Sequence, residues 1–350
     1  MPEQSFELLL NISAIHSAVI AELKATASRV SLGINIFKDC FGQHERRCEL
    51  ASETELIAAL SKIFTVSDPK LIVGIGDDGA VLKASTQNMV AATDMAVEGV
   101  HFKREWSNLH DIGAKIAAAN LADIFAMGGD PRYLLVSAGL TKDFGIAEIQ
   151  ELAQGIKSEA DLVGAAIIGG DISRAEQLVI SITALGEVEN PIKRAGAKVG
   201  DAVIISGLPG KSALGLHQLG KGESNSPYIR SHLKPEVNYQ LARKFRNVSA
   251  MCDVSDGLLS ELNHIATSSE VGIEVDVKAI ESIPGFSELS AAAGSNIWEF
   301  VLTGGEDHIF VATTSGEIPV GAYTIGRVVT GSEVKVPGIA NFSVKGFRHF

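Results

Sequence analysis

Cysteine is scarce in this sequence of 350 residues, where Cys40, Cys48 and Cys252 are the three examples. A small odd number of cysteines makes a poor disulfide framework and is typical of a protein in a reducing cytoplasm. Long hydrophobic runs are also missing, since no window reaches the roughly 18 uncharged apolar residues of a membrane span. The N-terminus lacks a basic segment before its apolar stretch, which argues against a secretory signal. We therefore expect a cytoplasmic protein with no membrane partner.

Positive charge is in deficit, with 30 Lys and Arg residues against 42 Asp and Glu and a formal net charge of −12. A general nucleic-acid binder needs a basic surface, so we expect no nucleic-acid partner. An acidic protein can still bind nucleotides when divalent cations link its carboxylates to phosphates. The 46% hydrophobic and 21% charged residues are ordinary for a globular protein with a core.

The length suggests two domains. Residues 1–51 differ from the rest and are interpreted either as an appended helix or loose extension, or as the product of a start codon placed too far upstream. Apolar periodicity predicts a mixed α/β first domain at 52–189 and an α/β second domain at 190–350. The expected elements include helices at 54–64, 112–127, 147–162 and 241–245, and strands at 89–93, 165–168 and 273–277.

Acidic residues recur at the ends of the expected strands or on glycine-rich turns. Five segments share this feature: Gly74–Ala80, Thr93–Asp94, Gly169–Asp171, Asp253–Gly257 and Gly304–Asp307. A sixth acidic segment, Asn120–Asp123, lies on an expected apolar helix. One Gly-Asp pair is usually only a turn, but six are harder to explain that way. Carboxylates gathered in a cleft repel one another, and Mg²⁺ is a cation that carboxylates and phosphates hold together. The pattern predicts a site for several magnesium ions and a polyphosphate, in a cleft between the domains.

The segment Gly207–Ser212 (GLPGKS) ends like a phosphate-binding Walker loop. That loop needs four residues between its last two glycines, and here there are two. We therefore expect a turn that caps a helix beginning near Ser212.

Ordered motifs carry a resemblance to a known family. They are GIGDDGAVL at 74–82, TDMAVEGVHF at 93–102, NLADIFAMGGDP at 120–131, IGGDISR at 168–174, RAGAKVGD at 194–201, DVSDGL at 253–258, GGEDH at 304–308 and KGF at 345–347. In this order they resemble the thiamine-monophosphate kinase family, within a superfamily that includes aminoimidazole ribonucleotide synthetase. The similarity covers about residues 52–350.

The resemblance implies an α/β fold with mixed sheets in two aminoimidazole ribonucleotide synthetase-like domains. It also implies a homodimer in which the N-terminal sheets of two subunits form a barrel. The implied reaction is Mg²⁺-dependent transfer of the ATP γ-phosphoryl group to thiamine monophosphate. By resemblance, the metal-binding residues are Asp78, Thr93, Asp94, Asp123, Asp171, Asp253 and Asp256. The implied ATP contacts are Gly170, Arg194 and Ser255, and the implied thiamine contacts are His101, Glu306 and Phe347.

The acceptor in this reaction is a phosphate oxygen that is already ionised at neutral pH, so we expect no general base and no covalent nucleophile. Two alternatives stay open: a superfamily member that uses ATP on another acceptor, and a nucleotide-binding protein without turnover. A selenophosphate synthetase would need a reactive cysteine in a glycine-rich N-terminal segment, which the surroundings of Cys40 do not match. The sequence departs from the family at His308, where the family often has tyrosine.

Overall fold

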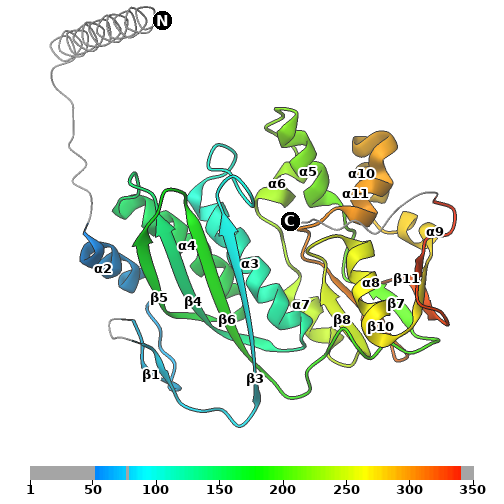
Figure 1. Ribbon diagram of the computed structural model, residues 1–350, viewed down its shortest axis with the longest axis horizontal. Coiled ribbons are helices and arrows are strands. Elements are labelled where there is room, and N and C mark those ends of the chain that lie inside the picture. The colour runs from blue at the N-terminus through cyan, green and yellow to red at the C-terminus, as the bar shows by residue number, and fades with distance from the viewer. Residues whose placement is uncertain (1–51, 76–78, 340–350) are drawn as a thin grey trace, which may run out of the picture. The chain divides into compact units, whose positions relative to one another are not determined.

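The computed structural model describes residues 52–75 and 79–339 (Figure 1). The first half of these residues forms α2 (Glu53–Ile63), β1 (Leu71–Val73), β2 (Val81–Leu82), β3 (Asn88–Val97), α3 (Leu109–Ala126), β4 (Asp130–Leu140), α4 (Ile146–Val163), β5 (Ala166–Arg174) and β6 (Val179–Val188). The second half forms β7 (Ala202–Ile205), α5 (Lys211–Gly220), α6 (Pro227–Leu233), α7 (Tyr239–Ala242), a 3₁₀ turn (Arg243–Phe245), β8 (Ala250–Asp253), α8 (Leu258–Ser269), β9 (Gly272–Val275), α9 (Val277–Glu281), α10 (Phe286–Ala293), a 3₁₀ turn (Gly294–Asn296), α11 (Ile297–Thr303), β10 (Phe310–Thr314), β11 (Tyr323–Val329) and β12 (Val334–Lys335). The expected mixed α/β fold is confirmed.

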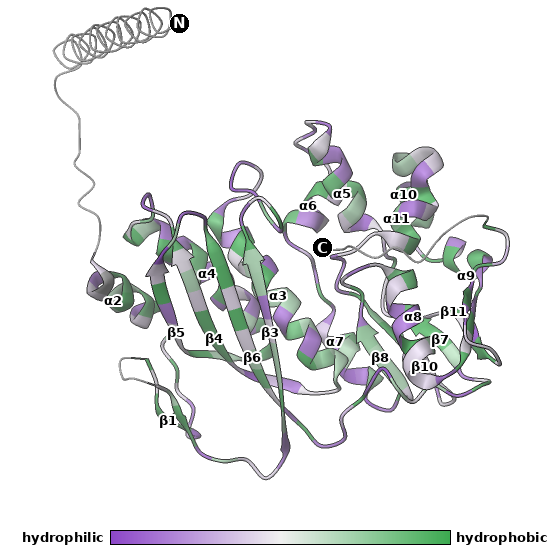
Figure 2. Cartoon of the chain, viewed as in Figure 1, coloured by the Kyte–Doolittle hydropathy of each residue, from purple (hydrophilic) through white to green (hydrophobic). Residues whose placement is uncertain are grey.

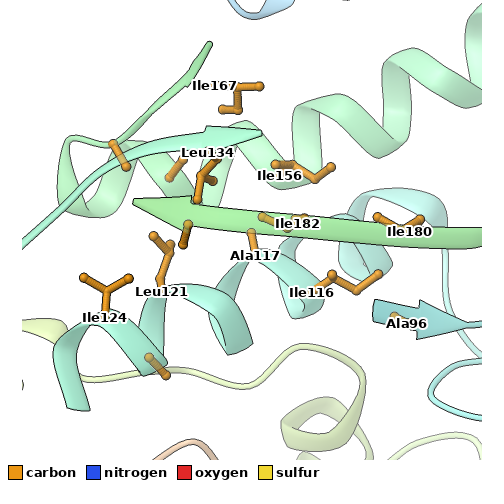
Figure 3. Close-up of a cluster of buried hydrophobic side chains, with 14 of the residues drawn as sticks. Ala96, Ile116, Ala117, Leu121, Ile124, Leu134, Ile156, Ile167, Ile180 and Ile182 are labelled. Carbon is orange, nitrogen blue, oxygen red and sulfur yellow. The ribbon is translucent and has the colours of Figure 1, made fainter. Parts of the chain in front are cut away.

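The first half is built on a four-stranded sheet in the order β3-β6-β4-β5. Strand β6 pairs antiparallel with β3 and β4, whereas β4 and β5 are parallel. Helices α3 and α4 pack against one face of this sheet, as Figure 1 shows. Their apolar side chains form the first core with those of the strands, including Leu121, Ile156 and Ile182 (Figure 3).

Helices α3 and α4 approach each other closely because each has a glycine at the contact. A Cβ atom on Gly155 of α4 would lie 1.9 Å from the carbonyl oxygen of His110. A Cβ atom on Gly113 of α3 would lie 2.3 Å from the carbonyl oxygen of Leu152. Neither position can hold a larger side chain unless the helices move apart.

The second half is built on a six-stranded sheet in the order β12-β9-β11-β7-β10-β8. Its strands β7 and β8 are mostly apolar (Figure 2) and are buried against α8 and α11 in a second core. Cys252 lies on β8 and is enclosed in this core, where burial raises the pKa of its thiol. None of the helices in the ranges 52–75 and 79–339 has the length and apolar character needed to cross a membrane.

Two expected strands are longer than the sequence indicated. Strand β3 runs to Val97 and β5 runs to Arg174, so Asp94 and Asp171 lie within strands and not after them. The prediction of strand ends at these aspartates was therefore wrong. Both strands continue because their neighbours β6 and β4 keep pairing with them through these positions.

Smaller differences have local causes. The strand expected at 273–277 ends at Val275, because the Asp276 side chain accepts the N–H groups of Lys278 and Ala279 and begins α9. The helix expected at 241–245 is divided between α7 and a 3₁₀ turn. The N-terminal segment 1–51, and with it Cys40 and Cys48, lies outside the described residues, as do Asp78 and Phe347.

Candidate active site

Three of the expected metal-binding aspartates act on one another electrostatically. Asp94 comes from β3, Asp123 from α3, and Asp253 from the end of β8. Asn120 links β3 to α3, since its side-chain oxygen accepts the Asp94 N–H at 3.1 Å and its amide donates to the Ile116 carbonyl at 2.9 Å. The acidic group defined by Asp94, Asp123 and Asp253 therefore draws on both sheets.

The surroundings of this acidic group resist a full set of negative charges. Burial, and then the charges of Asp253 and Asp94, raise the pKa of Asp123 to about 8. Desolvation and the charge of Asp253 also raise the pKa of Asp94. Buried carboxylates that repel one another are stabilised by a proton or by a bound cation. The acidic group is therefore suited to a positively charged ligand.

His308 is a side-chain partner of Asp253. Its Nδ1 atom lies 3.2 Å from Oδ2 of Asp253, and both side chains are buried. Burial opposes a charged imidazole, but the hydrogen bond to Asp253 and the negative charges of Asp253 and Glu306 raise the pKa of His308. A residue that departs from the family pattern thus lies directly against a candidate metal ligand.

Arg194, a candidate ATP contact, is close to the same acidic group. Its charge acts on Asp123, and its Nη2 atom lies 3.6 Å from Oε2 of Glu261 on α8. That Oε2 atom is buried and makes no hydrogen bond with any described residue. Burial, followed by the charge of Asp253, raises the pKa of Glu261 to about 7. Half of the Arg194 side chain stays exposed and can reach a ligand.

The candidate thiamine contacts His101 and Glu306 are linked by a buried lysine. The Lys115 Nζ atom lies 3.3 Å from Oε2 of Glu306 and 3.4 Å from the carbonyl oxygen of His101. His232 Nδ1 lies 3.4 Å from the same Glu306 oxygen and 3.0 Å from the Ser212 hydroxyl. Burial opposes ionisation of Glu306, but the charges of Lys115, His232 and His308 lower its pKa. Glu306 is thus held as a carboxylate.

Sequence reasoning missed Lys115, His232 and Glu261. Lys115 carried one detectable signal, because it is the only Lys or Arg in the largely buried helix α3 and lies in an apolar stretch of it. His232 and Glu261 carried none, because their partners are distant in the sequence.

Two other expected metal ligands face away from the acidic group. Side chains alternate along a strand, so Thr93 and Met95 point to the opposite face of the sheet from Asp94. The Thr93 hydroxyl accordingly contacts Thr183 at 3.0 Å. Asp171 shares that opposite face. It pairs with Ser137 of β4, Ser137 pairs with Ser181 of β6, and Ser181 pairs with Met95, so all four side chains lie on one face of the sheet. Within one chain, therefore, Thr93 and Asp171 do not join Asp94, Asp123 and Asp253.

Gly170 and Asp171 instead line a cavity of about 840 Å³. Its wall includes apolar residues of α2, α4 and the β1–β2 hairpin, among them Phe64 and Ile156. Gly170 is also required by the sheet, because a Cβ atom there would lie 1.8 Å from the carbonyl oxygen of Val136. This cavity is large enough for a small organic ligand.

The remaining candidates lie on the turn between β8 and α8. The Ser255 carbonyl accepts the Glu306 N–H at 2.8 Å, and the charge of Asp256 acts on Glu261. Within the described parts of the chain, no three His, Cys, Asp or Glu side chains form a ready metal site. The oxygen donors of the acidic group nevertheless fit Mg²⁺ chemically, because this ion prefers carboxylates combined with substrate phosphates.

Comparison with known protein families identifies both halves of the chain. The AIR synthase related protein N-terminal domain matches residues 76–188, and the corresponding C-terminal domain matches residues 198–337.

Individual relatives are similar over most of their length. The thiamine-monophosphate kinase of Mycobacterium tuberculosis is 38% identical over 289 residues, which are 80% of this chain and 86% of that protein. The thiamine-monophosphate kinase of Aquifex aeolicus is 34% identical over 79% of this chain and 92% of its own length. A solved structure of AaThiL complexed with AMPPCP and TMP has a TM-score of 0.70 and 30% identity, covering 85% of this chain and 97% of that one.

Proposed function

The chain belongs to the thiamine-monophosphate kinase family, and from this premise we propose that it transfers the γ-phosphoryl group of ATP to the phosphate of thiamine monophosphate. The products are thiamine diphosphate and ADP. The observation that carries the proposal is the acidic group of Asp94, Asp123 and Asp253, in which burial and mutual repulsion raise the pKa of Asp94 and Asp123 and so favour a cation that can bind phosphates. The likeness to AaThiL with AMPPCP and TMP supports the same two substrates here.

The reaction needs positioning and charge neutralisation more than proton transfer. A phosphate oxygen of thiamine monophosphate attacks the γ-phosphorus, and the bond from that phosphorus to the β–γ bridging oxygen breaks. The electron pair of this bond leaves with ADP. Because the attacking oxygen is already ionised at neutral pH, no side chain has to remove a proton. The task of the protein is to hold two polyanions in line.

Mg²⁺ is the cation that the acidic group fits. Asp94, Asp123 and Asp253 would hold it, with Asp78 and Asp256 as further expected ligands. Thr93 and Asp171, which face the other side of the sheet within one chain, are proposed to bind Mg²⁺ apart from this group. When bound, Mg²⁺ offsets negative charge on the phosphates of ATP. The carboxylates of this chain would bind Mg²⁺ and so orient the phosphates of ATP, and none of them is needed as a base.

Arg194 is proposed to contact a phosphate of ATP. A guanidinium group can donate two parallel hydrogen bonds to phosphate oxygens. Its position 3.6 Å from the buried Glu261 carboxylate supports a fixed orientation. Gly170 and Ser255 complete the proposed nucleotide contacts, with Gly170 on the wall of the cavity described above.

Glu306 and His101 are proposed to hold the thiamine part of the substrate. The thiazolium ring carries a positive charge, and Glu306 is a carboxylate with a third of its side chain exposed. Phe347 is proposed to stack on an aromatic ring of the substrate. Lys115 lies between His101 and Glu306 and sets their spacing.

We further propose a cytoplasmic homodimer in which the N-terminal sheets of two copies form one barrel. The sheet face that α3 and α4 leave uncovered displays Met89 and Met95, which are 58% and 60% exposed. A second copy that covers this face would bury these side chains and would also cover Thr93 and Asp171.

The proposed function is tested by acceptor choice. Purified protein is incubated with ATP and Mg²⁺, and with thiamine monophosphate, thiamine or an aminoimidazole precursor in separate reactions. Thiamine diphosphate should form from the monophosphate only. Turnover of another acceptor with none of thiamine monophosphate would assign the chain a different reaction of the superfamily. Binding of ATP with no turnover of any acceptor would favour a nucleotide-binding role.

A further inference from the structure

We propose that Asp307 is a positioning residue, whose carboxylate anchors the segment Gly304–His308 so that Glu306 and His308 face the candidate active site. The inference rests on the proposed function, because Glu306 is a proposed substrate contact and His308 touches Asp253. The Asp307 carboxylate bonds to the backbone N–H groups of Gly210 and Ser212 and is not proposed to contact substrate.

The anchor is a buried carboxylate at the beginning of α5. Asp307 Oδ2 accepts the N–H of Gly210 at 2.6 Å, and Oδ1 accepts the N–H of Ser212 at 2.9 Å. These donors belong to the GLPGKS segment that resembles a Walker loop. The anion that this turn binds is therefore a carboxylate of the same chain, and the expectation of a helix-capping turn is confirmed.

The residues on both sides of Asp307 have strained backbone conformations. Glu306 has φ +63° and His308 has φ +48°, in the left-handed region that favours glycine. Among the described residues the other non-glycine example is Glu270, which ends helix α8. Such conformations persist only where surrounding contacts enforce them. Two in a span of three residues indicate a strongly constrained segment.

The strained backbone turns the two flanking side chains toward the site. The Glu306 side chain reaches Lys115 and His232, while the His308 side chain reaches Asp253. Their N–H groups bond to the carbonyl oxygens of Ser255 and Val254, at 2.8 and 3.2 Å. These two hydrogen bonds hold the segment Gly304–His308 against the turn between β8 and α8.

Close packing makes the anchor effective. A Cβ atom on Gly305 would lie 2.2 Å from the carbonyl oxygen of Ser255, and one on Gly210 would lie 2.9 Å from the backbone of Phe300 and Val301. With so little free space, the position of the Asp307 carboxylate fixes the backbone on both sides of it. Loss of the anchor should therefore disturb Glu306 and His308 together.

The test is Asp307→Asn in the full-length protein, with Asp276→Asn as the matched control. Asp276 also accepts two backbone N–H groups, at 2.9 and 3.1 Å, but at the beginning of α9 and next to no strained residue. We expect Asp307→Asn to raise the KM for thiamine monophosphate at least tenfold and to lower kcat, with the KM for ATP changed less than threefold. Asp276→Asn should leave all three within twofold of wild type.

Hydrogen exchange gives a readout that does not depend on turnover. Exchange in the segments 207–213 and 304–309 should be faster in Asp307→Asn, and unchanged there in Asp276→Asn. If wild type phosphorylates thiamine monophosphate while Asp307→Asn matches the control in kinetics and exchange, the positioning role is rejected. If wild type does not phosphorylate it, the proposed function fails and exchange alone decides whether Asp307 anchors the segment.

Asp307→Glu serves if Asp307→Asn does not fold. It keeps the charge but displaces the carboxylate by one methylene group. A folded Asp307→Glu protein should show a several-fold higher KM for thiamine monophosphate, and an unchanged KM would overturn the proposal.

Discussion

The carboxyl group of Asp123 shows how a single residue can be held in an environment that is unfavourable to its own negative charge. Burial and two neighbouring carboxylates raise its pKa to about 8. The raised pKa means that an ionised Asp123 carboxylate is unfavourable in this position, since each unit of pKa shift corresponds to about 1.4 kcal/mol. A bound divalent cation would remove this penalty, which links folding stability to ligand binding.

Replacing Asp123 or Asp256 with Asn should lower kcat by about 10²-fold or more, because charge stabilisation of the transferred phosphoryl group is lost. The measurement is kcat at saturating ATP and thiamine monophosphate over a series of Mg²⁺ concentrations. Asp161→Asn, at an exposed ion pair on α4, is the control and should behave as wild type. Near-normal rates in both site variants would refute the metal assignment.

His232 should make the protein sensitive to mild acid. Burial, and next the charge of Lys115, lower its pKa to about 4. Its unfolded value is near 6.5, so between pH 6.5 and 4 the unfolded chain binds more protons than the folded one. The free energy of unfolding contributed by this group is therefore complete above pH 6.5 and is lost as the pH falls toward 4.

His232→Asn removes the imidazole that takes up a proton on unfolding, and it should therefore reduce the drop in melting temperature between pH 7 and pH 5. His217→Asn, at an exposed histidine of α5, should leave that drop unchanged. Thermal unfolding of the three proteins in matched buffers checks the prediction. Equal drops in wild type and His232→Asn would contradict it.

The sequence indicated candidate acidic residues but not what surrounds them. Asp94, Asp123 and Asp253 were candidates, and the structure places them in one electrostatically coupled group. Lys115 and His232 were not, because the lysine meets Glu306 across 191 positions of the chain and the histidine meets the same carboxylate from α6. No local pattern encodes such pairs.

At the scale of elements, the contact between α3 and α4 depends on two glycines in the interiors of helices. Helix propensity alone would favour alanine at Gly155 by about 1 kcal/mol. Here a Cβ atom would lie 1.9 Å from the His110 carbonyl oxygen, so packing opposes the change.

Gly155→Ala should lower the free energy of unfolding by about 1–3 kcal/mol, the usual cost of overpacking a core. Gly220→Ala at the end of α5, where a Cβ atom would meet nothing within 4 Å, is the control and should be neutral or stabilising. Urea denaturation followed by circular dichroism distinguishes them. A Gly155→Ala protein as stable as wild type would show that the two helices can move apart at little cost.

Strands were easier to predict than their ends. Apolar alternation indicated β3 and β5, but their extension through Asp94 and Asp171 depends on partners distant in the sequence. That extension has a functional consequence, because strand alternation then sends Thr93 and Asp94 to opposite faces of the sheet. A motif read as one cluster is thus divided between two surfaces.

At the scale of the whole molecule, the uncovered face of the first sheet is expected to be an interface between copies of the chain. Met95→Glu places a charge on that face and should convert the proposed dimer to a monomer at micromolar concentration. Val320→Glu is the control, because Val320 is 82% exposed and lies outside the first sheet. Sedimentation equilibrium reports the mass, and a Met95→Glu protein that stays dimeric would exclude this face.

The two halves of the described chain are also joined by polar contacts between their helices. The Tyr239 hydroxyl of α7 donates to Glu159 of α4 at 2.7 Å, and Arg230 of α6 pairs with Asp111 of α3. Such bonds require their partners, since a buried carboxylate left alone costs about 1–3 kcal/mol or more. They connect helices of the first half to helices of the second.

The buried Cys252 thiol can be used to measure local opening of the second sheet. Its thiol is enclosed beside Asp253 and its pKa is raised, so the reactive thiolate is suppressed while β8 stays paired with β10. In a protein whose Cys40 and Cys48 have been replaced by serine, the rate of alkylation would measure how often this sheet edge opens. Slower labelling in the presence of nucleotide would then show that ligand binding suppresses those openings.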